Sequence, residues 1–129
     1  MRLALGLAQA ALLSACASVP PVTSPGAGSL MHVVLLWIKD TAPADLRTRI
    51  VEFYTHRLRG SVPGIEVVWI GSARPSTRDV VDDTFSLMSI VRFADSAAEV
   101  GWQSHPVHEE LRALFGTHLA KVTVYDFVE

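Results

Sequence analysis

The segment 31–39, MHVVLLWIK, is the part that most constrains the fold of this 129-residue chain. It is rich in β-branched and aromatic residues and short for a helix, so it predicts a strand. One face of that strand carries Val34 and Leu36, and the other carries Leu35 and Trp37. Because both faces are apolar, we expect both sides of the sheet to be covered.

A helix is expected next. Thr41 supplies a capping hydroxyl and Pro43 fits a first helical turn, so together they predict where the helix starts. Apolar residues recur at helical spacing from Leu46 to Leu58, and Gly60 is typical of a helix end. This helix is expected to cover one face of the sheet.

A polar loop is expected at 73–83, between the second and third strands. Asp95, after the third strand, is expected to cap a second helix. Pro106 interrupts that helix and restarts it, because proline suits a first turn. The remaining apolar segments predict three further strands, at 65–72, 84–93 and 120–128.

The order strand, helix, strand, strand, helix, strand predicts an α+β, ferredoxin-like βαββαβ fold with a four-stranded antiparallel sheet. In that fold both helices cover the same face of the sheet. The other apolar face would form a large exposed patch, and a domain of residues 31–129 has no third layer to cover it. The simplest cover is a second copy of the chain, so the pattern predicts a homodimer, a dimeric α/β barrel.

Residues 1–15 precede this domain and predict a secretory signal peptide. Arg2 is followed by an apolar run at 3–13 and then by small residues, an order typical of export signals. The run is shorter than the ~18 residues of a membrane-spanning helix. The four residues 13–16, LSAC, resemble the lipobox of bacterial lipoproteins, and that resemblance implies lipidation of Cys16.

Residues 16–30 are expected to be the lipidated cysteine and a flexible linker, because the segment is rich in proline, glycine and serine. The implied location is the cell envelope, on the periplasmic side. By resemblance, Ala17 after the cysteine indicates the outer membrane in a host that has one. Two alternatives remain open: an ordinary signal peptide, or a true start at Met31.

Composition excludes several classes of site. The chain has one cysteine, which cannot form an internal disulfide or a cysteine-rich zinc site. Its formal net charge is −2 and it has no basic run, so a nucleic-acid partner is not expected. No glycine-rich phosphate loop is present, and no nucleotide, flavin or other cofactor is expected.

The most distinctive motif is His105-Pro106-Val107-His108. Two histidines three positions apart can share one helix face and could perform acid–base chemistry. We favour a capping role for His105 and a place in a ligand pocket for His108. His32 lies on an apolar strand face and could orient a ligand if that face lines a cavity. A metal site would need a third ligand such as Glu109 or His32, and none is expected.

Five short motifs together resemble the stress-responsive A/B barrel (Dabb) family over residues 31–129. They are His32–Leu36, Val62–Ile65, Phe93, His105–His108 and Val124–Phe127. The resemblance implies paired ferredoxin-like domains and, for most bacterial members, no assigned activity. Certain plant members are cofactor-free polyketide cyclases.

In those cyclases the second histidine of the motif, which matches His108, works with a tyrosine three residues before the motif. A histidine that matches His32 lies in the same pocket. This chain has Trp102 at the tyrosine position, and an indole cannot shuttle protons as a phenol does. The candidate pocket therefore contains His32, Trp102, His105 and His108, with His108 and His32 as the candidate catalytic pair.

Two functions stay open. The first, which Trp102 favours, is a membrane-anchored, dimeric stress-response module that binds a small apolar ligand. The alternative is a cofactor-independent cyclase or isomerase that acts on a hydrophobic carbonyl compound with His108 as acid or base.

Overall fold

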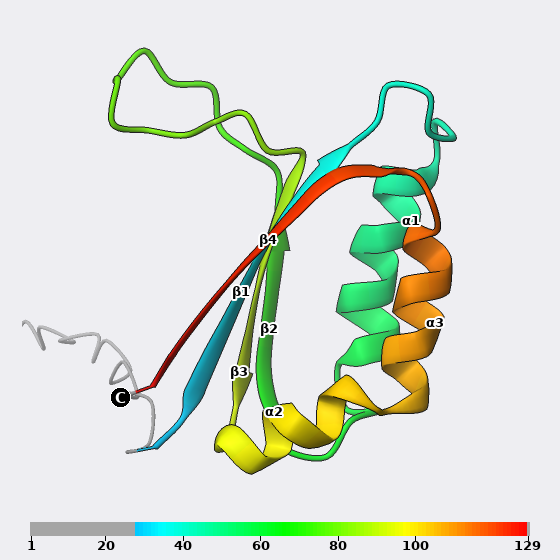
Figure 1. The fold of residues 1–129 in the computed structure, drawn as a ribbon, viewed down its shortest axis with the longest axis vertical. Coiled ribbons are helices and arrows are strands. Elements are labelled where there is room, and N and C mark those ends of the chain that lie inside the picture. Colours follow the sequence, from blue (N-terminus) through cyan, green and yellow to red (C-terminus); the bar gives the residue numbers. More distant parts are fainter. Residues whose placement is uncertain (1–27, 129) are drawn as a thin grey trace, which may run out of the picture.

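Four antiparallel strands form one sheet in the order β2-β3-β1-β4 (Figure 1). They are β1 (Leu30–Ile38), β2 (Ile65–Gly71), β3 (Leu87–Phe93) and β4 (Leu119–Val128). The computed structural model describes residues 28–128, so the expected signal peptide and Cys16 lie outside the described residues. The α+β, ferredoxin-like fold with a four-stranded antiparallel sheet is confirmed.

The helices all lie on one side of this sheet (Figure 1). Helix α1 (Leu46–Glu52) continues as the π-helix η1 (Phe53–Leu58), and α2 (Ser96–Gln103) is followed directly by α3 (Pro106–Phe115). Among residues 28–128, no helix is long and apolar enough to cross a membrane.

The expected start of the first helix at Thr41 and Pro43 is wrong. Residues 39–45 form turns instead. In them, the N–H of Ala42 donates to the Lys39 carbonyl at 3.0 Å. Pro43 accepts from the N–H of Leu46, also at 3.0 Å, and the helix begins only there. The chain needs this turn to leave the end of β1 and return across the sheet.

The third strand also begins later than its sequence indicates. Thr84 is held outside the strand, because its N–H and its hydroxyl both donate to one carboxylate oxygen of Asp82, at 2.9 and 2.7 Å. The predicted cap of the second helix is confirmed: Asp95 Oδ1 accepts from the N–H of Ala98 at 2.8 Å.

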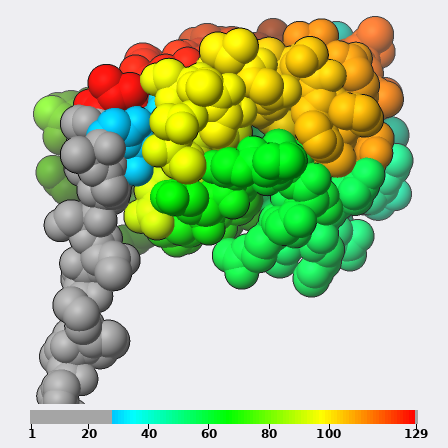
Figure 2. Space-filling view, turned by 90° about the horizontal axis from the view of Figure 1, so that it is seen from below, coloured from blue at the N-terminus to red at the C-terminus, as the bar shows by residue number. Residues whose placement is uncertain are grey.

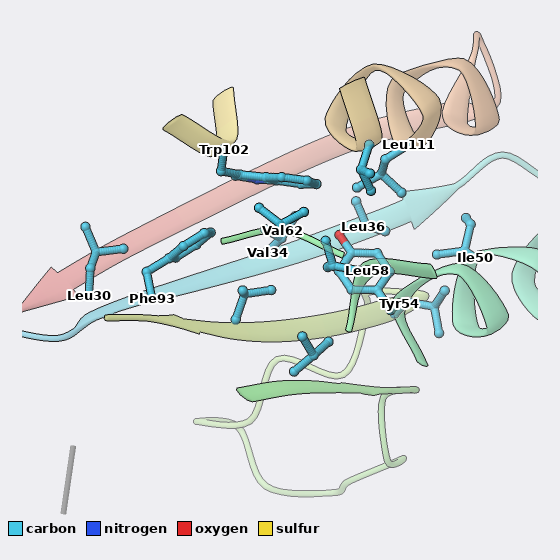
Figure 3. Packing of buried hydrophobic residues seen from close by; sticks show 14 of the residues in the cluster. Leu30, Val34, Leu36, Ile50, Tyr54, Leu58, Val62, Phe93, Trp102 and Leu111 are labelled. Atoms are coloured by element: carbon cyan, nitrogen blue, oxygen red, sulfur yellow. The ribbon is translucent and has the colours of Figure 1, made fainter. Parts of the chain in front are cut away.

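The core lies between the helices and the inner face of the sheet (Figure 3). Residues directly opposite each other in antiparallel strands share a face, so the register defines this face. On β1 it carries His32, Val34 and Leu36, which lie opposite Asp126, Val124 and Val122 of β4. The most deeply buried apolar side chains, from β1, β3, α1 and η1, are Leu36, Leu46, Ile50, Leu58, Leu87 and Phe93.

The opposite side of the sheet, called here the outer face, is also apolar. Trp69, Tyr125 and Phe127 are about half exposed there, with relative exposures of 49%, 60% and 51%. The register adds Met31, Val33, Leu35, Trp37, Val67, Met88 and Ile90 to this face. No helix within residues 28–128 covers it (Figure 1).

Gly64 explains why one of the short sequence motifs contains a glycine. Its φ is +82°, and a Cβ added there would lie only 2.4 Å from the Cβ of Ala98 on α2. The space-filling view shows α2 packed against the segment that leads into β2 (Figure 2). Glycine is therefore needed both for the backbone conformation and for the close approach of α2.

Candidate functional site

A cavity of about 240 Å³ lies between the inner face of the sheet and the helical layer. Its polar lining includes His32, Tyr54, Trp102, His108 and Asp126. Most of its wall is apolar and comes from β1, β3, β4 and α3: Val34, Val91, Leu111, Phe115, Val122 and Val124. Gln103 and Arg112 complete the lining. A concave space with an apolar wall and convergent polar groups is typical of small-molecule sites.

His108 lies in the first turn of α3 and its ring is fixed by a backbone carbonyl. Its Nδ1 lies 3.1 Å from the carbonyl oxygen of Gln103. A carbonyl oxygen only accepts, so Nδ1 must carry the hydrogen and donate it. In the neutral ring, Nε2 then carries the free lone pair, which is the arrangement that a general base needs.

The indole of Trp102 packs against the imidazole ring of His108. The centroids of the indole and the imidazole are 4.4 Å apart, and their planes are inclined by 30°. Trp102 is 3% exposed, and Figure 3 shows its ring extending from α2 over the buried cluster. Trp102 lies near the end of α2 (Ser96–Gln103) and His108 lies in the first turn of α3, which begins at Pro106. The break between the two helices places these residues next to each other.

His32 and Asp126 form a second polar pair in the cavity lining. They are direct partners in the β1–β4 register, and Nδ1 of His32 lies 2.7 Å from Oδ1 of Asp126. The carboxylate accepts from Nδ1–H, so the neutral His32 ring also keeps its lone pair on Nε2. The ring packs edge-on against Phe93, with centroids 6.1 Å apart. Sequence reasoning singled out His32 but not Asp126.

Tyr54 is a cavity residue that the sequence placed only in an apolar helix stripe. It is 3% exposed, and burial raises the pKa of its phenol to about 12. The nearby Ser89 hydroxyl opposes this effect on the pKa, although by geometry the Ser89 oxygen has no hydrogen-bond partner among the described residues. The Tyr54 phenol therefore stays protonated at neutral pH and can donate a hydrogen bond to a ligand.

The π-helix η1 keeps Tyr54 directed at the cavity. Leu46, Ile50, Tyr54 and Leu58 are spaced by four residues, and all four are buried. Positions spaced by four rotate steadily around a helix with 3.6 residues per turn. A π-helix has more residues per turn, so it reduces the rotation between Tyr54 and Leu58 in the second half of the helix. Both side chains therefore stay on the side that faces the sheet. The hydroxyl of Thr55 donates to the Val51 carbonyl at 2.7 Å, a side-chain bond that competes with regular helix bonding.

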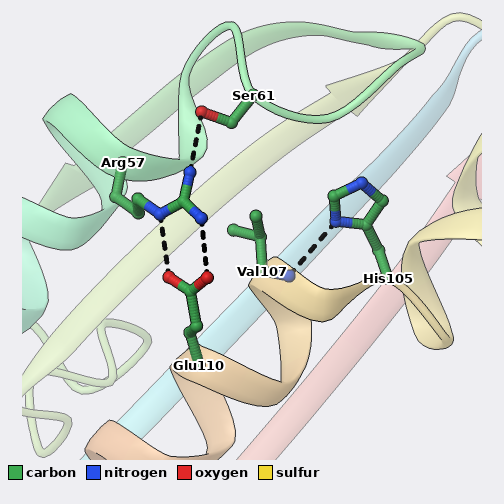
Figure 4. A network of polar contacts seen from close by, with 5 residues as sticks. All are labelled: Arg57, Ser61, His105, Val107 and Glu110. Atoms are coloured by element: carbon green, nitrogen blue, oxygen red, sulfur yellow. Dashed lines mark hydrogen bonds and ion pairs between the residues drawn. The ribbon is translucent and has the colours of Figure 1, made fainter.

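His105 does not line the cavity. It is the N-cap of α3, and its Nδ1 accepts from the N–H of Val107 at 3.2 Å (Figure 4). The same view shows that Arg57 of η1 makes two parallel bonds to the Glu110 carboxylate of α3, at 2.8 and 2.6 Å. These contacts fix the helix that carries His108.

Within residues 28–128 no group of three histidine, cysteine, aspartate or glutamate side chains is placed to hold a metal ion. Glu109, the third ligand considered from the sequence, instead lies 3.6 Å from Arg112.

The fold and the cavity together define a class: a ferredoxin-like α+β domain with a histidine-containing cavity between its helices and its sheet. The chain belongs to the Stress responsive A/B Barrel Domain (Dabb) family, whose model matches residues 30–129. Among curated proteins, none matches the chain.

Solved structures share this fold at low sequence identity. A hydroxynitrile lyase from Passiflora edulis is 17% identical with a TM-score of 0.69, and the match covers 82% of this chain and 95% of that one. A dimeric ferredoxin-like protein of unknown function from Thermobifida fusca is 16% identical with a TM-score of 0.65, covering 81% and 93%. Another dimeric one, from Bacteroides fragilis, is 15% identical with a TM-score of 0.63, covering 79% and 97%.

Proposed function

We propose that the cavity binds a small, mainly apolar molecule that carries a hydrogen-bonding group such as a carbonyl. The observation that carries this proposal is the arrangement of polar groups in an apolar wall. The Tyr54 phenol can donate a hydrogen bond, and the Nδ1 bond to Gln103 leaves Nε2 of His108 free. A few such groups orient a ligand while the apolar wall supplies most of the binding free energy.

The size of the cavity limits the ligand. Pockets for drug-sized molecules have volumes of roughly 300–1,000 Å³. The cavity here has about 240 Å³, so it suits a single ring or a short chain with one polar end.

Binding can be tested with 4-fluoroacetophenone, a small ketone that is followed by fluorine NMR. We expect its signal to broaden in the presence of the protein. The Val124→Trp variant should abolish the effect, because a large side chain on β4 would fill the cavity. Val100→Trp is the control, since Val100 is 67% exposed on α2 and does not line the cavity. Equal broadening with both variants would contradict the proposal.

A second candidate function is cofactor-free acid–base catalysis with His108 as base and His32 as a second catalytic group. It is favoured by the two imidazoles, each of which has Nδ1 bound to an acceptor and Nε2 free. One reaction to assay is cyanohydrin cleavage, which the lyase among the structural neighbours suggests. The base would take the hydroxyl proton, the carbon–carbon bond to the nitrile would break, and cyanide would leave and be protonated.

The assay follows release of benzaldehyde from mandelonitrile by absorbance. If His108 is the base, His108→Ala should lower kcat by about 100-fold or more. Wild-type turnover that is no faster than the uncatalysed rate would exclude this reaction, and equal turnover of His108→Ala would exclude His108 as its base.

We further propose that the chain acts as a homodimer through the outer face of the sheet. Trp69, Tyr125 and Phe127 are about half exposed on this apolar face, and the solved neighbours from Thermobifida fusca and Bacteroides fragilis are described as dimeric. A stress-response role is in keeping with the family to which the chain belongs.

We also propose that the dimer is anchored to the cell envelope, through lipid on Cys16, and faces the periplasm. The support is the sequence of the first 16 residues alone. Several acyl chains on one residue give stable anchoring where a single chain does not. Fractionation of cells that express Cys16→Ser should recover the protein away from membranes, and retention in the membrane fraction would refute lipidation.

A further inference from the structure

The connection between β2 and β3, residues 72–86, forms an arm that projects from the sheet. Figure 1 shows this arm on the side of the sheet away from the helices, which is the side of the outer face. Val80, in its middle, is 84% exposed. The arm thus extends from the fold on the side where a second copy is expected.

The arm is ordered by bonds of its own. The N–H of Ser76 donates to Asp83 Oδ2 across the arm at 2.8 Å, and the Ser76 hydroxyl accepts from the N–H of Arg78 at 3.1 Å. At the tip, the N–H of Val81 donates to the Arg78 carbonyl at 3.0 Å. A connection ordered in this way loses little conformational entropy when it binds a partner.

The base of the arm is attached firmly to the sheet. The indole N–H of Trp37 donates to the Thr84 hydroxyl at 3.0 Å, and the N–H of Ile38 donates to the Ser86 hydroxyl at 2.9 Å. On the other side, Arg47 of α1 donates to the Ser72 hydroxyl and to the Ser86 carbonyl. These bonds hold the direction of the arm relative to the outer face.

The length of the arm is sufficient to reach a second subunit packed on the outer face. About six residues lead out to the tip, which gives a reach of up to roughly 20 Å at ~3.3 Å per residue. Two sheets that pack face to face lie only about 10 Å apart. A fixed arm on this side can therefore reach past the sheet of a second copy.

We propose that the arm clasps the partner subunit, with the tip around Val80 in contact with the second copy. The proposal rests on the proposed homodimer and adds a surface that the sheet alone does not provide. In a two-fold dimer each arm contacts the other subunit equivalently, so the contact is made twice. The apolar side chain of Val80, which is 84% exposed in one subunit, is then covered instead of exposed to water.

The proposal can be tested by site-specific photo-cross-linking of the purified full chain in mild detergent. The photoreactive residue p-benzoylphenylalanine replaces Val80 at the tip of the arm, Thr123 in β4 or Glu52 in α1. Thr123 is opposite Leu35 on the outer face, whereas Glu52 is exposed on the helical side. We expect a covalent dimer from positions 80 and 123 and none from position 52.

Other cross-linking results would contradict either the clasp or the homodimer on which it rests. A cross-link from position 123 without one from position 80 would refute the clasp and leave the dimer intact. A monomeric protein without any cross-link would refute both. A cross-link from position 80 to lipid would assign the arm to a membrane surface instead. In addition, Val80→Asp should weaken dimerisation about tenfold, which corresponds to roughly 1.4 kcal/mol.

Discussion

The rings of Trp102 and His108 stack across the junction of α2 and α3, with centroids 4.4 Å apart and planes inclined by 30°. The indole supplies a flat apolar surface for the imidazole, and it has no titratable phenol. The consequence is a histidine held on one side by stacking and on the other by the Gln103 carbonyl.

Replacing Trp102 should therefore affect both stability and binding. Trp102→Ala removes a buried ring and should lower the free energy of unfolding by about 3–5 kcal/mol. Trp102→Phe should cost less and retain the stacking on His108. Urea denaturation measures the first effect, and the fluorine NMR assay with 4-fluoroacetophenone measures the second. Val100→Ala, an exposed site on α2, is the control and should change neither quantity.

Tyr54 predicts a specific loss of stability at alkaline pH. The pKa of its phenol is raised from 10.0 to about 12 in the folded protein. The unfolded chain thus loses this proton near pH 10, whereas the folded protein still holds it. The stabilisation is complete below pH 10 and should decline by roughly 2–3 kcal/mol as the pH rises to 12.

The measurement compares urea unfolding of the wild type and Tyr54→Phe between pH 9 and pH 12. The difference in their unfolding free energies should change over this interval, because Phe has no proton to lose. Tyr125→Phe removes the other tyrosine phenol of the chain, which lies on the outer face of the sheet, and shows whether a phenol outside the cavity contributes to the same change. Parallel curves for the wild type and Tyr54→Phe would show that the phenol is not protected from ionisation.

Gly64 and Ala98 offer a test of packing by paired substitution. Gly64→Ala places a methyl group 2.4 Å from the Cβ of Ala98 and strains a left-handed backbone, so we expect a loss above 2 kcal/mol, on the order of 2–4. Gly60→Ala has a similar φ of +77° but no neighbour within 4 Å, so it should show only the backbone cost of about 1–2 kcal/mol.

The double variant with Ala98→Gly should recover part of the loss at position 64, apart from about 1 kcal/mol for glycine in a helix. Thermal unfolding of the four proteins gives the coupling energy between the two positions. If the two substitutions were simply additive, close packing of α2 would not be the reason for glycine at this position.

The outer face predicts how dimerisation can be disrupted without unfolding the subunit. Tyr125→Asp introduces a charge where two copies are expected to meet, at a side chain that is 60% exposed in one subunit. Sedimentation analysis should change from dimer to monomer, while the circular dichroism spectrum stays the same. Val100→Asp, on the helical side, should leave the dimer unchanged. A dimeric Tyr125→Asp protein would indicate a different interface.

Much of the fold could be predicted from local patterns. Alternating apolar residues and well-placed prolines and glycines indicated the order of elements, the Asp95 cap and the restart of the helix at Pro106. The starts at Thr41 and Thr84 were wrong for one physical reason. Both residues have side chains or neighbours suited to a regular element, but the chain uses them in connections. Thr41 lies between β1 and α1, and Thr84 lies at the base of the arm between β2 and β3.

The candidate site was less accessible to sequence reasoning. His32 and His108 stood out because titratable side chains on apolar elements are uncommon. Asp126 did not, because its pairing with His32 depends on the β1–β4 register, which brings together residues 94 positions apart. The signal for Tyr54 was its spacing of four from Ile50 and Leu58, which places all three on the same side of the helix. That spacing predicts burial, but it does not show that the side chain lines a cavity.

The pairing of Leu30 with Val128 brings the beginning of β1 beside the end of β4. The first and last strands of the domain thus begin and end at the same end of the sheet, and the arm lies near the opposite end (Figure 1). The topology therefore permits circular permutation: a short linker could join residue 128 to residue 30 while new ends are opened within the arm. Such a permutant would keep every strand pairing of the sheet. It would show that the fold does not depend on the order in which the strands follow one another along the chain.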